Sequence, residues 1–274
     1  MSTRLHTMKP ALAVYNELKE KVTFLYRKLK LFTYEHTTGR KLSLPIIETI
    51  TLALYKQTQS IATKKAIWKD FAPFCSYKTL VVNMNRCAML ALLVLMRILR
   101  LNQSDAHPIK HTDSTDIPVC LNKNAKSHKT MYGLAQWGHS GKGHYYGIKL
   151  HLTTDLKRKI LSVLFTPGNT HGTKIFLKLN KKLNGIFVAD AEFISEKLQR
   201  DFYQEHRRIL FANPRKNMKK LIDAFQYHPR NTRMLIELNF RNLKLFFGLI
   251  TSLPRSINGY FANYFYALLA YALR

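Results

Sequence analysis

The chain has 274 residues, which is enough to bury a sizeable core in one large domain or two modest ones. Hydrophobic residues make up 46% of it and aromatic residues 12%, and this content excludes a wholly disordered protein. Lys and Arg number 44 against 16 Asp and Glu, a formal net charge of +28 that indicates a nucleic acid as the partner. A basic solubility surface or a membrane-facing patch is the alternative explanation of this charge.

The first hundred residues have the apolar spacing of helices. Apolar residues recur at intervals of three and four from Ala11 to about Asn102. The longest apolar run, CAMLALLVLM at Cys87–Met96, is about half as long as a bilayer span and predicts a buried core helix. Residues 60–86 could hold a helix-turn-helix, although an ordinary turn between bundle helices is the preferred interpretation. We therefore expect an all-helical N-terminal domain at residues 1–102.

The compartment is predicted from the first residues and the cysteines. The segment MSTRLHTMKP lacks an apolar signal segment. The cysteines Cys75, Cys87 and Cys120 are odd in number and include no close pair, which fits neither a disulfide framework nor a zinc site. We expect a reducing cytoplasm and no membrane association.

After Asn102 the pattern changes from helical to mixed. Short strands are predicted at 109–113, 145–154, 160–166, 185–190 and 208–212, with a long polar and basic segment at 122–143. Helices are predicted at 173–183, 193–206, about 232–252 and 257–273. An antiparallel start followed by helix-linked strands predicts an α/β fold, with a mixed sheet and helices on its faces. This order is that of a ribonuclease H-like fold, expected over residues 103–274.

Two acidic residues follow predicted strands, and a third lies on a helix. Asp113 ends the first strand and Asp190 ends the apolar run GIFVAD, so neighbouring strands would bring both to one edge of the sheet. Glu237 lies with Arg233, Arg241 and Lys244 on one stripe of its helix. Spacing alone favours a solvated helix face with an Arg–Glu pair for this stripe.

From His111 onward the chain resembles the DDE transposases of bacterial insertion sequences, most closely the insertion-sequence 982 family. The resemblance spans roughly the last 160 residues. Arg233, Glu237 and Lys244 also match the R-x3-E-x6-K part of a signature of related transposases, whose Tyr position holds Arg230. The matching segments are DSTDIPVC, YYGIKLHLTT, LFTPGNTHG, GIFVADAEFIS, NPRKNMKK, RMLIELNFRNLK and LLAYAL.

The resemblance implies that Asp113, Asp190 and Glu237 hold two divalent metal ions, Mg²⁺ or Mn²⁺, as catalytic carboxylates. It further implies cleavage of the element's terminal inverted repeats and transfer of the 3′-hydroxyl into target DNA. The expected active form is a homodimer on double-stranded DNA, in the bacterial cytoplasm and associated with the nucleoid. The expected DNA contacts are Lys149, Arg233, Arg241 and Lys244, and the expected role of residues 1–102 is to bind the DNA end.

Several positions leave alternatives open. Asp116 competes with Asp113 as a ligand, and Glu192 could assist Asp190, although an ordinary first-turn acid is the preferred interpretation. The family usually has Gly-Asp-Lys-Gly-Tyr around the second Asp, where this chain has Ala189, Asp190, Ala191, Glu192 and Phe193. Such departures keep a catalytically inactive DNA-binding relic or regulator as the alternative function, and a nuclease without strand transfer as a third.

Overall fold

The computed structural model describes residues 11–34, 43–71, 75–141, 143–212, 231–250 and 254–274. The chain forms two compact units. The helical unit comprises Met1–Leu95, Leu245–Pro254 and Asn258–Arg274, and the sheet unit comprises Met96–Lys244 and Arg255–Ile257. The family segment NPRKNMKK at 213–220 and Arg230 lie outside the described residues.

The helical unit is formed by segments from both ends of the chain. Its elements are α1 (Ala11–Lys28), η1 (Leu31–Tyr34), α2 (Ile46–Thr58), α3 (Lys64–Phe71), most of α4 (Tyr77–Ser104) and α9 (Ile257–Ala272). The Tyr266 hydroxyl donates to the Met84 carbonyl oxygen at 2.9 Å, and the Gln57 amide donates to Asn263 Oδ1 at 2.8 Å. The division at residue 102 expected from the sequence groups α9 with the strands, whereas these contacts group it with α2 and α4.

The apolar run at Cys87–Met96 lies within α4, which is longer than the run itself. Leu90, Val94 and Leu95 are buried, whereas Met89 and Leu93 are exposed on another side of the helix. Among the described helices, α4 alone is long and apolar enough to cross a membrane, with a mean hydropathy of 1.7 over its best window. Half of that window is buried inside the protein, and a core helix passes the same test, so this is weak evidence for a span.

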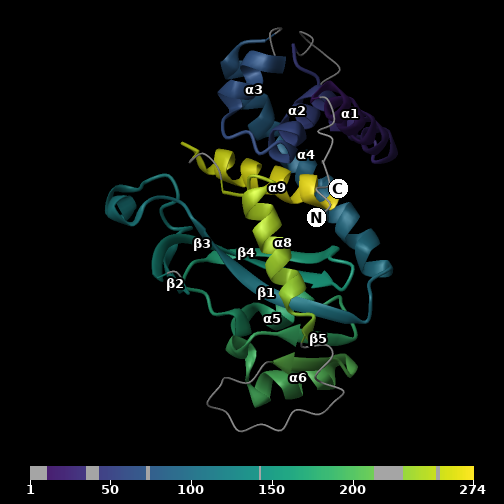
Figure 1. The fold of residues 1–274 in the computed structure, drawn as a ribbon, viewed down its shortest axis with the longest axis vertical. Helices are drawn as coiled ribbons and strands as arrows, with labels where there is room; N and C mark the ends of the chain where they lie inside the picture. The colour runs from purple at the N-terminus through teal and green to yellow at the C-terminus, as the bar shows by residue number, and fades with distance from the viewer. Residues whose placement is uncertain (1–10, 35–42, 72–74, 142, 213–230, 251–253) are drawn as a thin grey trace, which may run out of the picture. The chain divides into compact units, whose positions relative to one another are not determined.

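The sheet unit contains a mixed sheet of six strands in the order β2-β3-β1-β5-β6, with β4 also paired to β3 (Figure 1). The strands are β1 (Ile109–Pro118), β2 (Gln136–Ser140), β3 (Gly143–Asp155), β4 (Ile160–Pro167), β5 (Ile186–Ala189) and β6 (Ile209–Ala212). The neighbours of β3 are all antiparallel to it, whereas β1, β5 and β6 run parallel. The predicted mixed sheet is therefore confirmed.

Helical segments accompany the strands of this unit. They are η2 (Asn122–Ser127), α5 (Gly172–Asn180), η3 (Ala191–Phe193), α6 (Glu196–His206) and α8 (Met234–Leu245). The helix predicted at 232–252 is shorter than expected, because α8 ends at Leu245. The segment at 122–143, expected to be a long polar and basic segment, contains both η2 and β2.

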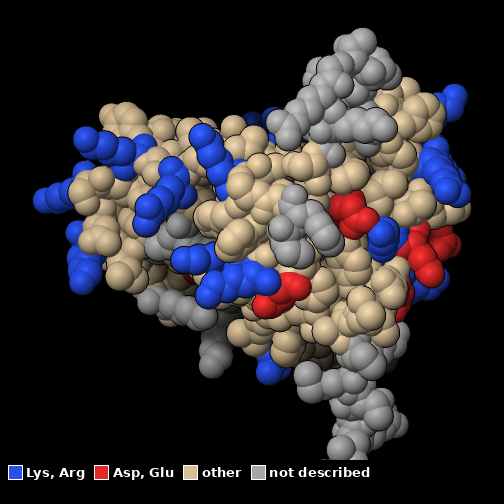
Figure 2. All heavy atoms as spheres, turned by 90° about the horizontal axis from the view of Figure 1, so that it is seen from above, with Lys and Arg blue, Asp and Glu red and all other residues tan. Residues whose placement is uncertain are grey.

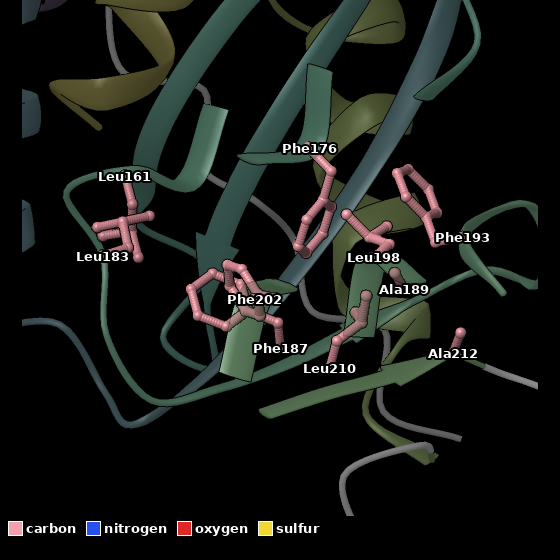
Figure 3. Packing of buried hydrophobic residues seen from close by; sticks show 10 residues of the cluster. All are labelled: Leu161, Phe176, Leu183, Phe187, Ala189, Phe193, Leu198, Phe202, Leu210 and Ala212. Atoms are coloured by element: carbon pink, nitrogen blue, oxygen red, sulfur yellow. The ribbon is translucent and has the colours of Figure 1, made fainter. Parts of the chain in front are cut away.

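A cluster of phenylalanines holds α5, η3 and α6 against β5. The ring centroids of Phe176 and Phe202 lie 5.0 Å apart, and those of Phe187 and Phe202 lie 4.9 Å apart, both edge to face. Phe193 of η3 packs on Phe176 at 5.5 Å. Figure 3 shows these rings pointing toward one another from separate elements. The cluster fixes the position of the chain immediately before and after Asp190.

Candidate active site

The register of β1 and β5 places Asp113 and Asp190 on neighbouring segments. The two strands are parallel, with Thr112 opposite Ala189, and the aspartates are the next residues on each. The expectation that Asp113 ends its strand is wrong, because β1 continues to Pro118 by pairing with β3. Asp113 lies at an edge for a different reason: β5 ends at Ala189, so its pairing with β1 ends at Thr112 and Asp113 has no partner on β5.

Both aspartates are oriented by the backbone that follows them. Asp113 Oδ1 accepts a hydrogen bond from the amide of Ser114 at 2.7 Å, and Asp190 Oδ1 accepts one from the amide of Ala191 at the same distance. Asp190 thereby caps η3. Each carboxylate keeps a second oxygen for other partners.

Arg233 connects Asp190 to Glu237. Its Nη1 lies 3.3 Å from Asp190 Oδ1, and its Nη2 lies 2.5 Å from Glu237 Oε1. The second distance follows from helical spacing, because residues four apart lie on one face. The Arg233 side chain is 22% exposed, against 48% for Asp190 and 55% for Glu237. The most enclosed group in this ion-pair network is therefore the cation.

Asp113 faces the same charges. The pKa of its carboxyl is raised from 3.8 to about 7, mainly by burial and to a smaller extent by the negative charges of Asp190 and Glu237. The amide of Ser114 and the Arg233 guanidinium act in the opposite direction. The charges of Arg233, Asp190 and Glu237 therefore all act on the Asp113 carboxyl, although no ion pair joins Asp113 to Arg233 among the described contacts.

Buried His111 ties β1 to the chain just before α8, a role that the sequence analysis missed. Its Nε2 lies 2.8 Å from the Thr232 hydroxyl, next to Arg233. Burial lowers the pKa of His111 to about 4, with Asp155 raising it and His107 lowering it. The ring is therefore neutral near pH 7 and serves as a positioning contact for Arg233. A histidine two residues before Asp113 on the same predicted strand was the available signal.

The remaining predicted residues lie around this group with partners of their own. Lys244 Nζ lies 3.0 Å from Asp116 Oδ1, and each side chain is about one fifth exposed. Lys149 donates to the carbonyl oxygen of Thr170 at 3.2 Å, and Arg241 is exposed on α8. Asp116, the competing ligand, is thus engaged by a cation of α8.

Glu192 helps to hold the start of α5. Its Oε1 accepts from the amide of Gly172 at 2.9 Å and lies 3.6 Å from His171 Nε2. A Cβ at Gly172 would lie 2.6 Å from Cζ of Phe193, so glycine is required for this close approach. Glu192 therefore links η3 to α5, the two segments that frame Asp190.

The carboxylates fit a hard divalent cation by their chemistry, although their present counter-charge is a guanidinium. Among the described residues, no three His, Cys, Asp or Glu side chains are close enough to hold a metal ion as they now stand. If all three carboxylates are ionised, one guanidinium leaves an excess of negative charge, which a bound cation would offset. Oxygen-only ligands of this kind suit Mg²⁺ or Mn²⁺.

A family model described as "Transposase DDE domain" matches residues 103–256. The match begins just before β1, ends after α8, and contains Asp113, Asp190 and Glu237. No curated protein and no solved structure matches the chain. Because the family model covers more than half of the 274 residues, the chain belongs to the DDE transposase family.

Proposed function

We propose that the protein is the transposase of a bacterial insertion sequence, closest to the insertion-sequence 982 family. It cleaves the ends of its element in a metal-dependent reaction and joins the 3′-hydroxyl to target DNA. One observation supports the proposal: Asp190 and Glu237 share the Arg233 guanidinium, whose charge also acts on Asp113, within the segment that matches the family. A carboxylate group of this kind needs a cation, and cation-assisted phosphoryl transfer uses one.

The strand arrangement supports a ribonuclease H-like catalytic domain. The antiparallel set β4-β3-β1 is followed by the helix-linked parallel strands β5 and β6, with a carboxylate at the end of β5. The helices α1 to α4 before β1 support a helical N-terminal region that binds the DNA end. These assignments belong to the proposal.

Asp113, Asp190 and Glu237 would hold the metal ions through their free carboxylate oxygens. When bound, two Mg²⁺ or Mn²⁺ ions would activate a water or a 3′-hydroxyl and stabilise the departing oxygen. Asp113 would release the proton that it holds near neutral pH, because a cation favours its ionised form. Arg233, relieved of its carboxylate partners, would turn to a DNA phosphate.

The basic residues near the carboxylates supply the proposed DNA contacts. Two of them, Arg241 and Lys244, lie on α8, the helix that carries Glu237. The third, Lys149, lies on β3, which pairs with the strand of Asp113. Figure 2 shows more Lys and Arg than Asp and Glu over the face that it draws, in agreement with the net charge of +28. We propose double-stranded DNA bearing the terminal inverted repeats as the substrate, and a homodimer in the bacterial cytoplasm as the active form.

The test is a nicking assay on DNA that contains the sequences flanking the gene, with Mg²⁺ or EDTA. We expect Mg²⁺-dependent nicks at the element ends, loss of nicking in Asp190→Asn, and retained DNA binding in that variant. Asp201→Asn on α6 makes the same change outside the carboxylate group and should cleave normally. Binding without nicking by the unaltered protein would contradict the proposal and support the inactive DNA-binding relic or regulator.

That alternative has one structural observation in its favour, since Arg233 already neutralises two of the carboxylates. A third function, cleavage without joining, is tested by supplying a pre-cut 3′ end together with target plasmid. Joined product is expected for a transposase, and its absence would indicate a nuclease.

A further inference from the structure

Four aromatic or imidazole rings lie on one face of the β2–β3 hairpin. Trp137 is opposite Tyr146, and His139 is opposite His144. Side chains at alternate positions of a strand share a face, and directly opposed residues of antiparallel strands share it too. The Trp137 and Tyr146 rings lie 5.7 Å apart, and the two imidazoles lie 4.9 Å apart, both in edge-to-face contact. We call these four residues the aromatic face.

The opposite face of the hairpin is packed against the sheet. Gly138 and Tyr145 are buried there, and a Cβ at Gly138 would lie 2.5 Å from the Gly168 carbonyl oxygen. The aromatic face is therefore directed away from the protein, with Trp137 47% exposed and both imidazoles exposed. Large exposed rings on an ordered strand are costly in water unless a partner covers them.

The hairpin is held rigidly in spite of its exposure. The amide of Val119 donates to the carbonyl oxygen of Tyr146 at 3.1 Å, and the Asn122 side chain donates to that of His144 at 2.8 Å. The His128 ring packs edge-on against Tyr146, with centroids 6.3 Å apart. Because these contacts hold both strands, a ligand would meet rings whose positions are already set.

The segment that is hydrogen-bonded to the hairpin carries exposed lysines, and acids are absent from this part of the sequence. No Asp or Glu occurs between Ile117 and Thr154. Lys123, Lys126 and Lys129 are exposed on and just after η2, the segment that Asn122 ties to the hairpin. An acidic ligand with flat faces complements such a surface, and a nucleic-acid strand has both properties.

We infer that the aromatic face binds unpaired nucleotides of a DNA strand, with bases stacked on Trp137 and Tyr146 and phosphates near the lysines. Double-stranded DNA presents its phosphates to such a surface but keeps its base faces covered by stacking, so an unpaired segment fits better. The surface contains none of the three carboxylates. The inference therefore goes beyond the proposed cleavage reaction and holds whether or not the chain cleaves DNA.

Tryptophan fluorescence tests the contact directly, because the chain contains only two tryptophans. Trp68 lies in the helical unit, where its Nε1 donates to the Cys75 carbonyl oxygen at 2.7 Å. A Trp68→Phe protein carries Trp137 as its single reporter. In EDTA, a thymidine oligonucleotide of about 15 nucleotides should quench this emission, since that length covers a typical single-strand site. Polyphosphate at equal charge should leave it nearly unchanged.

Affinity measurements on variants separate stacking from charge. We expect Trp137→Leu to weaken oligonucleotide binding roughly 5- to 150-fold, the range for one lost stacking contact. It should change blunt-duplex binding little, and Trp137→Phe should retain much of the affinity because it keeps a ring. Circular dichroism should show the native fold in both variants, since the side chain is half exposed.

Three outcomes would overturn the inference. One is an unquenched Trp137 in the presence of oligonucleotide, and another is equal quenching by polyphosphate. The third is a Trp137→Leu variant that binds the oligonucleotide as well as the unaltered protein does, which would leave the aromatic face to a protein partner. Because the measurements are made in EDTA, a failure of the nicking assay would not affect them.

Discussion

Asp113→Asn should stabilise the metal-free protein, and more so at high pH. The pKa of Asp113 is raised from 3.8 to about 7, so folding favours the protonated carboxyl. Its contribution to stability is present in full below about pH 4 and is lost as the pH rises through about 7. Asparagine has nearly the same shape and remains neutral, and its oxygen can still accept from the Ser114 amide.

The size of the stabilisation by Asp113→Asn follows from the pKa shift of Asp113. Each pKa unit corresponds to about 1.4 kcal/mol, so the three units between the two values set an upper limit of about 4 kcal/mol at pH 8 and above. The side chain keeps some exposure, which reduces this value. For 150 to 250 residues, each kcal/mol raises Tm by about 2–4 °C. We expect a gain of several degrees at pH 8 and almost none at pH 4.

Thermal unfolding followed by circular dichroism in EDTA, from pH 4 to 9, measures this difference. Asp105→Asn is the control with the opposite sign, because hydrogen bonding to Lys159 lowers the pKa of that carboxyl. Mg²⁺ should then raise the Tm of the unaltered protein at pH 8 more than that of Asp113→Asn. A Tm difference that does not change with pH, or a less stable Asp113→Asn at pH 8, would refute the reasoning.

Three further substitutions test the surroundings of the carboxylates. Arg233→Ala removes the counter-charge of Asp190 and Glu237. In EDTA we expect the free energy of unfolding to fall by less than about 1 kcal/mol, since both carboxylates are about half exposed. In melting experiments Mg²⁺ should stabilise this variant more than it stabilises the unaltered protein. Lys244→Ala breaks the pair with Asp116 and should lower the free energy of unfolding in urea by about 1 kcal/mol. Lys244→Arg should keep most of that stability. If Lys244→Ala is as stable as the unaltered protein, the pair is excluded as a stabilising contact. Gly147→Ala should lower the free energy of unfolding by about 1–3 kcal/mol in the same assay, because its Cβ would lie 2.2 Å from the Ile117 carbonyl oxygen across β1 and β3. Gly141→Ala is the control and should be nearly neutral, since a Cβ there would meet open space.

Local patterns in the sequence were sufficient for the mixed sheet and for the neighbourhood of Asp113 and Asp190. Each aspartate follows residues that were predicted to form a short strand, and helix-linked strands that run parallel expose their carboxyl ends at one edge. Glu237 could be placed on a helix by periodicity, but its function could not, because an Arg four residues earlier also fits an ordinary surface pair. The family resemblance, together with the match over 103–256, favours a metal-binding role for Glu237, and that role is part of the proposal.

Other features depend on contacts between segments that are distant in the chain. β1 runs past Asp113 because β3 continues to pair with it, and strand length is set by the partner's hydrogen bonds more than by local composition. The predicted polar segment at 122–143 contains β2 for the same reason: its alternating aromatic residues are paired only once β3 lies beside them. Arg233, which the family resemblance implies as a DNA contact, meets Asp190 only because β5 and α8 approach each other in the folded protein. The pKa of Asp113 likewise depends on burial and on two charges from other elements, and a linear pattern of residues specifies neither.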